Sequence, residues 1–88
     1  MPALEIFWRR SAEKDLRKIP TKTVPRIINK IEKLSDNPLP GGVRKLEGAV
    51  RTYRVKVGEY RVVYQINRET NKIIIIYIRH RKDAYKDL

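Results

Sequence analysis

Apolar and polar positions follow two different rhythms along the chain, and each rhythm predicts a different kind of element. In Leu4–Trp8 the alternation is that of a strand. Over residues 11–19 the apolar side chains recur at helical spacing until Pro20 ends the segment. Over residues 24–34 they form a clearer helical stripe: Val24, Ile27, Ile28, Ile31 and Leu34. Neither helix is long enough to be stable alone, so we expect the two to pack as a hairpin on a sheet.

The ends of both helices carry residues that suit those positions. Ser11 is expected to cap the first helix, with Glu13 in the first turn, where the helix dipole favours an anion. Thr23 is expected to cap the second helix, with Pro25 in the first turn, where no amide donor is missed. The prolines and glycines of residues 37–42 end that helix and predict a loop.

The second half of the chain predicts strands. Thr52–Val57 and Tyr60–Asn67 alternate with period two, and Gly58-Glu59 between them suits a two-residue hairpin turn with glycine first. Residues 68–71 form a second turn, which leads into a last strand, Lys72–Arg79.

The last strand contains four successive isoleucines, Ile73 to Ile76, so it places apolar side chains on both faces of the sheet. This is typical of a central strand that is covered on both faces. The element order is strand, helix, helix and then three strands. It predicts one α+β domain over residues 1–88, with a two-helix hairpin packed on one face of a mainly antiparallel four-stranded sheet (β-α-α-β-β-β).

The Gly58-Glu59 turn also fixes which side chains share a face, because it places Lys56 opposite Arg61 and Arg54 opposite Val63. The face expected to receive the helices then contains Tyr53, Val55, Val57, Tyr60, Val62 and Tyr64. The other face carries the three cations. Like charges directly opposite one another disfavour a sheet by some tenths of a kcal/mol. Either their heads spread into water or the face binds phosphate, and the convergence of three cations favours phosphate.

The net charge points to an anionic partner as well. The chain has 21 Lys and Arg against 10 Asp and Glu, a formal charge of +11. Residues 44–82 alone hold eleven basic groups and three glutamates, a net of +8. Such a field attracts polyanions and accelerates encounter with them. The alternative is a surface that is merely solubilised, and a lipid surface is disfavoured because no helix has a bulky aromatic face.

The segment after the last strand adds candidate site residues. If Ile66 pairs with Ile73, His80 lies on the cationic face, and a slip by one residue would reverse this. His80 is the only histidine, and its side chain suits proton transfer, although a lone histidine at a strand end is often structural. Arg81 and Tyr85 are four residues apart and can act together from a short terminal turn. Tyr85 is then either a packing anchor or a surface on which a base stacks.

Several classes of protein are disfavoured by what the sequence lacks. Without cysteine there is no disulfide or thiolate metal site, and one histidine among scattered carboxylates offers no ligand cluster. A phosphate-binding glycine loop and a Ser/His/Asp set are missing too. No segment reaches the ~18 apolar residues of a membrane span, and no signal peptide is visible. We therefore expect a cytoplasmic protein that needs no cofactor and does not act at a membrane.

Four stretches, in this order and spacing, resemble the RelE/ParE toxin superfamily and span nearly the whole chain. They are residues 11–16 (SAEKDL), 45–48 (KLEG), 53–64 (YRVKVGEYRVVY) and 80–85 (HRKDAY). Each is weakly specific alone, and together they are specific. The fold that the resemblance implies is RelE-like, two helices on a mainly antiparallel sheet, in agreement with the reading above.

Within the superfamily the chain looks like the RelE type, because it shares the basic pair on a strand, the arginine after the hairpin and the basic tail with a tyrosine. RelE-type toxins cut messenger RNA in the ribosomal A site without metal, by attack of the 2′-hydroxyl on the adjacent phosphate. The resemblance implies that Arg54 and Lys56 contact the scissile region and that Arg61 stabilises the phosphorane. It also implies that Arg81 assists the leaving oxygen and that Tyr85 orients the substrate.

One departure from the family pattern concerns the general base. The best-known enzymes have lysine where Arg54 stands, and arginine stays protonated in proteins, so it is a poor base. Lys56 and His80 are the remaining candidates. The resemblance also implies three partners, namely an acidic RelB-like antitoxin, the ribosome and messenger RNA. Two other functions stay open: a ParE-like inhibitor of DNA gyrase and a basic nucleic-acid-binding module without activity.

Overall fold

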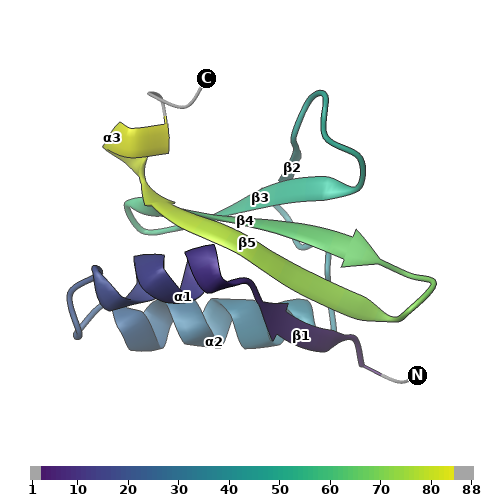
Figure 1. Cartoon of the computed structure of the whole chain (residues 1–88), viewed down its shortest axis with the longest axis horizontal. Helices are drawn as coiled ribbons and strands as arrows, with labels where there is room; N and C mark the ends of the chain where they lie inside the picture. Colours follow the sequence, from purple (N-terminus) through teal and green to yellow (C-terminus); the bar gives the residue numbers. More distant parts are fainter. Residues whose placement is uncertain (1–2, 85–88) are drawn as a thin grey trace.

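The computed structural model describes residues 3–84, in which two helices lie under one face of a twisted sheet (Figure 1). The helices are α1 (Arg10–Arg17) and α2 (Val24–Leu34), and a one-turn helix, α3 (Arg81–Ala84), follows the last strand. The strands are β1 (Glu5–Trp8), β2 (Arg44–Lys45), β3 (Thr52–Val57), β4 (Tyr60–Asn67) and β5 (Lys72–His80). In Figure 1, α3 and the connection from β2 to β3 lie on the side of the sheet opposite α1 and α2.

The sheet has five strands in the order β1-β5-β4-β3-β2, where the sequence predicted four. Strand β1 runs parallel to β5, and the other pairs are antiparallel. The added strand is β2, in which Arg44 pairs with Arg54 and Lys45 with Tyr53. Two residues are too few to show a period, so the alternation in the sequence gave no sign of this strand. The α+β class and the helix pair on one face are confirmed.

The core lies between the helices and the sheet. Its fully buried large side chains are Tyr64, Ile27, Ile31, Leu34, Ile73, Ile75 and Val62. Tyr64 is the one polar member of this set, and its hydroxyl donates a hydrogen bond of 2.6 Å to the carbonyl of Pro38. Burial raises the pKa of the Tyr64 phenol well above its ordinary value, and the nearby Tyr53 adds to the effect. The loop after α2 is thereby tied to the centre of the sheet.

The first helix begins earlier than predicted, since its N-cap is Arg9 rather than Ser11. Ser11 lies in the first turn, and its hydroxyl donates to the carbonyl oxygen of Ile76 at 2.5 Å. Thr23 is the N-cap of α2 as expected, but its side chain makes no capping hydrogen bond. The hydroxyl of Ser11 therefore forms a hydrogen bond to the backbone of β5 and does not cap its own helix.

A bulge in β5 changes which residues face the helices. Ile66 pairs with Ile73 as anticipated, but Tyr64 pairs with Ile75 and Val63 with Tyr77, so Ile76 has no partner on β4. This extra residue reverses the alternation after it. His80, opposite Tyr60, lies on the helix-covered side, and the prediction that it shares the cationic face is wrong.

The bulge places Arg79 on the open face instead, opposite Arg61. Strand β5 is central, as predicted, because it pairs with β1 on one side and β4 on the other. Its coverage is different on its two faces, however. Ile73 and Ile75 are completely buried against the helices, whereas Ile74 and Ile76 remain half-exposed.

Helix α1 covers the outer edge of β5 where β1 ends. The amide of Arg9 donates to the carbonyl of Ile75, and the carboxylate of Asp15 accepts from the amide of Ile78 at 3.0 Å. With the Ser11 hydroxyl, these groups replace the hydrogen bonds that another strand would make. Residues of α1 and its N-cap thus form the hydrogen bonds at the edge of the C-terminal half of β5.

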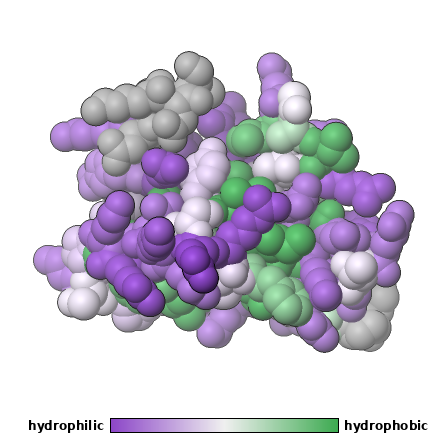
Figure 2. Space-filling model, viewed as in Figure 1, coloured by the Kyte–Doolittle hydropathy of each residue, from purple (hydrophilic) through white to green (hydrophobic). Residues whose placement is uncertain are grey.

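Hydrophilic residues cover most of the surface in the view of Figure 2, and hydrophobic ones show at its middle and on the β2 side. The large apolar side chains that are most exposed are Phe7, Leu39 and Val50. Among residues 3–84, no helix has the length and apolar character needed to cross a membrane.

Candidate functional site

The open face of the sheet carries two rows of side chains that cross several strands. In the first row, Arg44 of β2 is paired with Arg54 of β3, and Arg54 with Val63 of β4. Val63 continues the row to Tyr77 of β5. In the second row, Lys56 is opposite Arg61 and Arg61 is opposite Arg79. The hairpin register predicted from Gly58-Glu59 is confirmed, and with it the juxtaposition of Lys56 and Arg61.

Four of these cations line one hollow. It has a volume of about 400 Å³, and its lining residues are Gly42, Arg44, Arg54, Lys56 and Arg61. Among the side chains that the structure describes, no acidic one lines it. Arg54 and Arg61 are half-buried, and Lys56 is exposed, so the hollow has positively charged side chains at different depths from the solvent. Three predicted site residues, Arg54, Lys56 and Arg61, are therefore brought together.

Arg44 belongs to this hollow and was not singled out in the sequence. It stands on the two-residue strand β2, where no periodicity reveals the face of a side chain. The only signal available was its position directly before the Lys45-Leu46-Glu47-Gly48 stretch. Its membership follows from the pairing with Arg54, which only the folded chain supplies.

Arg79 joins the open face beside an aromatic ring. Its guanidinium lies 4.9 Å from the ring centroid of Tyr77, two residues earlier on the same strand. Its Nε is 3.9 Å from a carboxylate oxygen of Asp15. Next to the cations the open face is therefore aromatic and apolar, since Tyr77 pairs with the buried Val63.

His80 is part of a different cluster at the end of β5. Its Nε2 is 3.2 Å from a carboxylate oxygen of Glu59, and its Nδ1 accepts a hydrogen bond from the amide of Lys82. Its ring meets the edge of Tyr60 at 5.2 Å between centroids. A neutral ring protonated on Nε2 satisfies both contacts. The hollow of cations does not include His80, which instead joins the end of β5 to the β3–β4 turn.

The two remaining candidates lie in the tail. Arg81 is the first residue of α3 and is exposed, and its amide donates to the carbonyl of Glu59 at 2.7 Å. The structure therefore fixes the base of the tail at the hairpin turn. Tyr85 lies outside the described residues.

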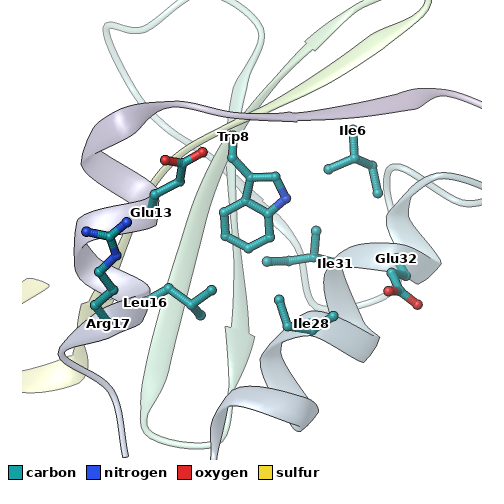
Figure 3. Close-up of a pocket in the computed structure, with 8 residues that line it drawn as sticks. All are labelled: Ile6, Trp8, Glu13, Leu16, Arg17, Ile28, Ile31 and Glu32. Atoms are coloured by element: carbon teal, nitrogen blue, oxygen red, sulfur yellow. The ribbon is translucent and has the colours of Figure 1, made fainter. Parts of the chain in front are cut away.

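A second, more apolar hollow lies between the helices, on the other side of the sheet (Figure 3). It has a volume of about 550 Å³, and the indole of Trp8 points into it between α1 and α2. Its apolar lining consists of Ile6, Trp8, Leu16, Ile28 and Ile31. Glu13, Arg17 and Glu32 supply charges of both signs at its border. This hollow suits apolar side chains, whereas the cationic hollow suits a phosphate group.

The arrangement of cations can bind and stabilise a phosphate whose negative charge increases during a reaction. In the part of the chain that the structure describes, no three His, Cys, Asp or Glu side chains come together as metal ligands. The chemistry available in the hollow is accordingly that of fixed positive charge and of the exposed amine of Lys56.

Comparison with known proteins agrees with this architecture. Residues 6–85 match the family described as the ParE toxin of the type II toxin–antitoxin system parDE. The chain belongs to the RelE/ParE toxin family. A protein of Methanocaldococcus jannaschii named toxin RelE1 is 35% identical to this RelE/ParE-family chain over 77 residues, which are 84% of this chain and 86% of the relative. Toxin RelE3 of the same organism is 30% identical over 86 residues, 93% of this chain and 96% of the relative.

The fold of the RelE/ParE-family chain also matches solved structures. The archaeal RelE–RelB complex from Pyrococcus horikoshii contains a chain that is 27% identical, with a TM-score of 0.79 over 90% of this chain and 96% of that one. The relatives named RelE and the RelE-like fold together make this chain a type II toxin of the RelE kind.

Proposed function

We propose that this toxin is a ribosome-dependent, metal-independent endoribonuclease that cleaves messenger RNA in the A site. The observation that carries the proposal is the hollow on the open face, in which Arg54, Lys56 and Arg61 converge and in which no acidic side chain of residues 3–82 takes part. A structural role would require counter-charges there, and like charges in register weaken a sheet. A phosphodiester carries the negative charge that suits this set of basic side chains, and the adjoining aromatic Tyr77 is typical of surfaces that bind single-stranded nucleic acid.

The reaction needs no group beyond the RNA and the side chains. The 2′-oxygen gives up its proton, bonds to the adjacent phosphorus and displaces the 5′-oxygen, which takes up a proton. Arg54 and Lys56 hold the scissile phosphate, and Arg61 stabilises the charge that builds up on it. Arg81, near the hairpin turn, assists the leaving oxygen, and Tyr85 orients the substrate.

Lys56 is the residue we propose as proton acceptor, a role that its amine fills only in the neutral form, after losing its own proton. Arginine stays protonated, so neither Arg54 nor Arg61 suits the role. Both ring nitrogens of His80 are engaged, one by Glu59 and one by an amide, and the ring belongs to the other side of the sheet. Among the candidates, the amine of Lys56 is the proton-exchanging group that lines the hollow.

The test is a map of cleavage sites after brief induction. Primer extension on cellular transcripts should show cuts inside translated codons, and the purified protein should barely cut RNA in the absence of ribosomes. Intact transcripts would contradict the proposal. A gyrase supercoiling assay run in parallel addresses a second candidate function, inhibition of DNA gyrase, which the match to the ParE family favours. Blocked supercoiling with uncut transcripts would establish that function instead.

An acidic antitoxin is the protein partner that we propose. The toxin from Pyrococcus horikoshii was solved as a complex of RelE with RelB. Residues 44–82 of this chain carry a net charge of +8, which accelerates association with an acidic chain. Co-purification from the native locus tests the partner, and rising salt should slow its association more than it speeds release. A neighbouring protein that binds without suppressing cleavage would contradict the proposal.

A further inference from the structure

The hollow on the open face is lined by a fourth basic residue, Arg44, to which the cleavage reaction proposed above gives no role. We propose that Arg44 binds a second phosphate of the RNA strand, next to the scissile one, so that the site holds two consecutive phosphates. The proposal rests on the nuclease function proposed above, and it adds to that function a residue and a minimum length of substrate.

The position of Arg44 in the sheet separates it from the other cations. It lies on the edge strand β2, two strands away from Arg61. Neighbouring strands are about 4.8 Å apart, so the backbones that carry Arg44 and Arg61 are separated by roughly 10 Å. Arg44 therefore approaches the shared hollow from the edge of the sheet, whereas Arg61 approaches it from a strand inside the sheet.

Hydrogen bonds on both sides hold Arg44 in place. Before it, the amide of Val43 donates to the carbonyl of Pro40 across a turn in which Gly42 has a φ of +87°. After it, the amide of Leu46 donates to the carbonyl of Thr52 at 2.9 Å. Because the loop before this turn is tied to the sheet through Pro38 and the Tyr64 hydroxyl, the backbone that carries Arg44 has a fixed position.

A purely structural role does not account for Arg44. Within residues 3–84 its side chain has neither an ion pair nor a hydrogen bond, and it stands opposite another arginine, Arg54. The next residue, Lys45, has the same charge and is also exposed, but it pairs with Tyr53, whose side chain packs on the core. Lys45 therefore provides a matched control of equal charge that points away from the hollow.

The experiment is a titration of the purified full-length protein with two short RNAs, followed by NMR. Both RNAs carry 2′-O-methyl groups so that they are not cut; the dinucleotide has one phosphate and the trinucleotide has two. We expect Arg44→Ala to weaken binding of the trinucleotide by roughly tenfold and to leave the dinucleotide unchanged, because one charge-assisted contact is lost. Lys45→Ala should match the wild type on both, and Arg44→Lys should recover most of the loss.

Three outcomes would overturn the inference. If Arg44→Ala weakens both RNAs equally, Arg44 serves the first phosphate. If Arg44→Ala and Lys45→Ala have the same effect, only the overall charge matters. If the wild type prefers neither RNA length, no second phosphate is bound. Failure of the nuclease function is seen separately, as uncut transcripts on induction of the wild-type protein.

Discussion

The two faces of the sheet are built from the same strands, yet one is apolar and buried and the other is basic and open. On the helix-covered face, Val55, Val62 and Ile78 are at most 3% exposed and pack in the core. One residue away from each, Arg54, Arg61 and Arg79 stand on the open face with like charges as neighbours. The covered face stabilises the fold through apolar burial, and the open face gives up some stability to concentrate charge. The alternation of side chains along β3 and β4, and along β5 after its bulge, thus separates the core from the cationic face.

The largest expected effect belongs to the covered face. Ile31→Ala removes a side chain that is 1% exposed and leaves a cavity between α2 and the sheet. The free energy of unfolding should fall by about 2–5 kcal/mol. Urea denaturation measures it, with Val50→Ala, at a position 74% exposed, as the control that should change little. An equal loss in both variants would mean that the covered face is not the source of stability.

On the open face, Arg61→Ala should reduce cleavage rather than stability. Loss of charge stabilisation at the phosphorane is expected to slow cleavage by ~10²-fold or more. The circular dichroism spectrum and the denaturation midpoint should stay close to those of the wild type. Arg68→Ala, which removes the same charge from the exposed turn after β4, is the control. A folded Arg61→Ala protein with wild-type cleavage would falsify the role of Arg61.

A smaller effect is expected where the covered face meets the edge of β5. Asp15→Ala leaves the amide of Ile78 without its acceptor, which should cost about 1–3 kcal/mol. Asp15→Asn keeps an acceptor oxygen and should lose less. Hydrogen exchange of the Ile78 amide reports on this site directly. If that amide exchanges equally fast in the two variants and the wild type, α1 does not protect the edge.

The smallest effect concerns the pH dependence of stability. The pKa of Tyr64 is raised in the folded protein, whereas in the unfolded chain the phenol ionises near its ordinary value of 10.0. The stability contributed by neutral Tyr64 is therefore complete below pH 10 and is lost above it, by up to about 1.4 kcal/mol per pH unit. Tyr64→Phe should remove this part of the alkaline loss. Denaturation curves of both proteins at pH 9 and pH 11 measure the difference, and parallel losses would exclude Tyr64 as its source.

The hairpin that carries the cations could be predicted from the sequence because its register is a local property. The Gly58-Glu59 turn determines the pairing of Lys56 with Arg61 without reference to the rest of the chain. The face on which His80 lies is not determined by nearby residues, since it depends on the bulge between β4 and β5. No glycine or other turn residue in the isoleucine run indicates that bulge. Arg44 was missed for another reason, because its own strand has two residues, too few to show which face a side chain takes.

Because Ile76 has no partner on β4, deletion of this residue and substitution of this residue should have different effects on β5. Residues 72–75 and residues 77–80 are out of phase, so an in-frame deletion of the Ile76 codon would exchange inward for outward side chains in one half. Arg79 would then be driven toward the core and Ile78 toward solvent. A missense change at Ile76, whose side chain is half-exposed, leaves the phase intact. At this position, the fold therefore depends on the number of residues more than on their identity.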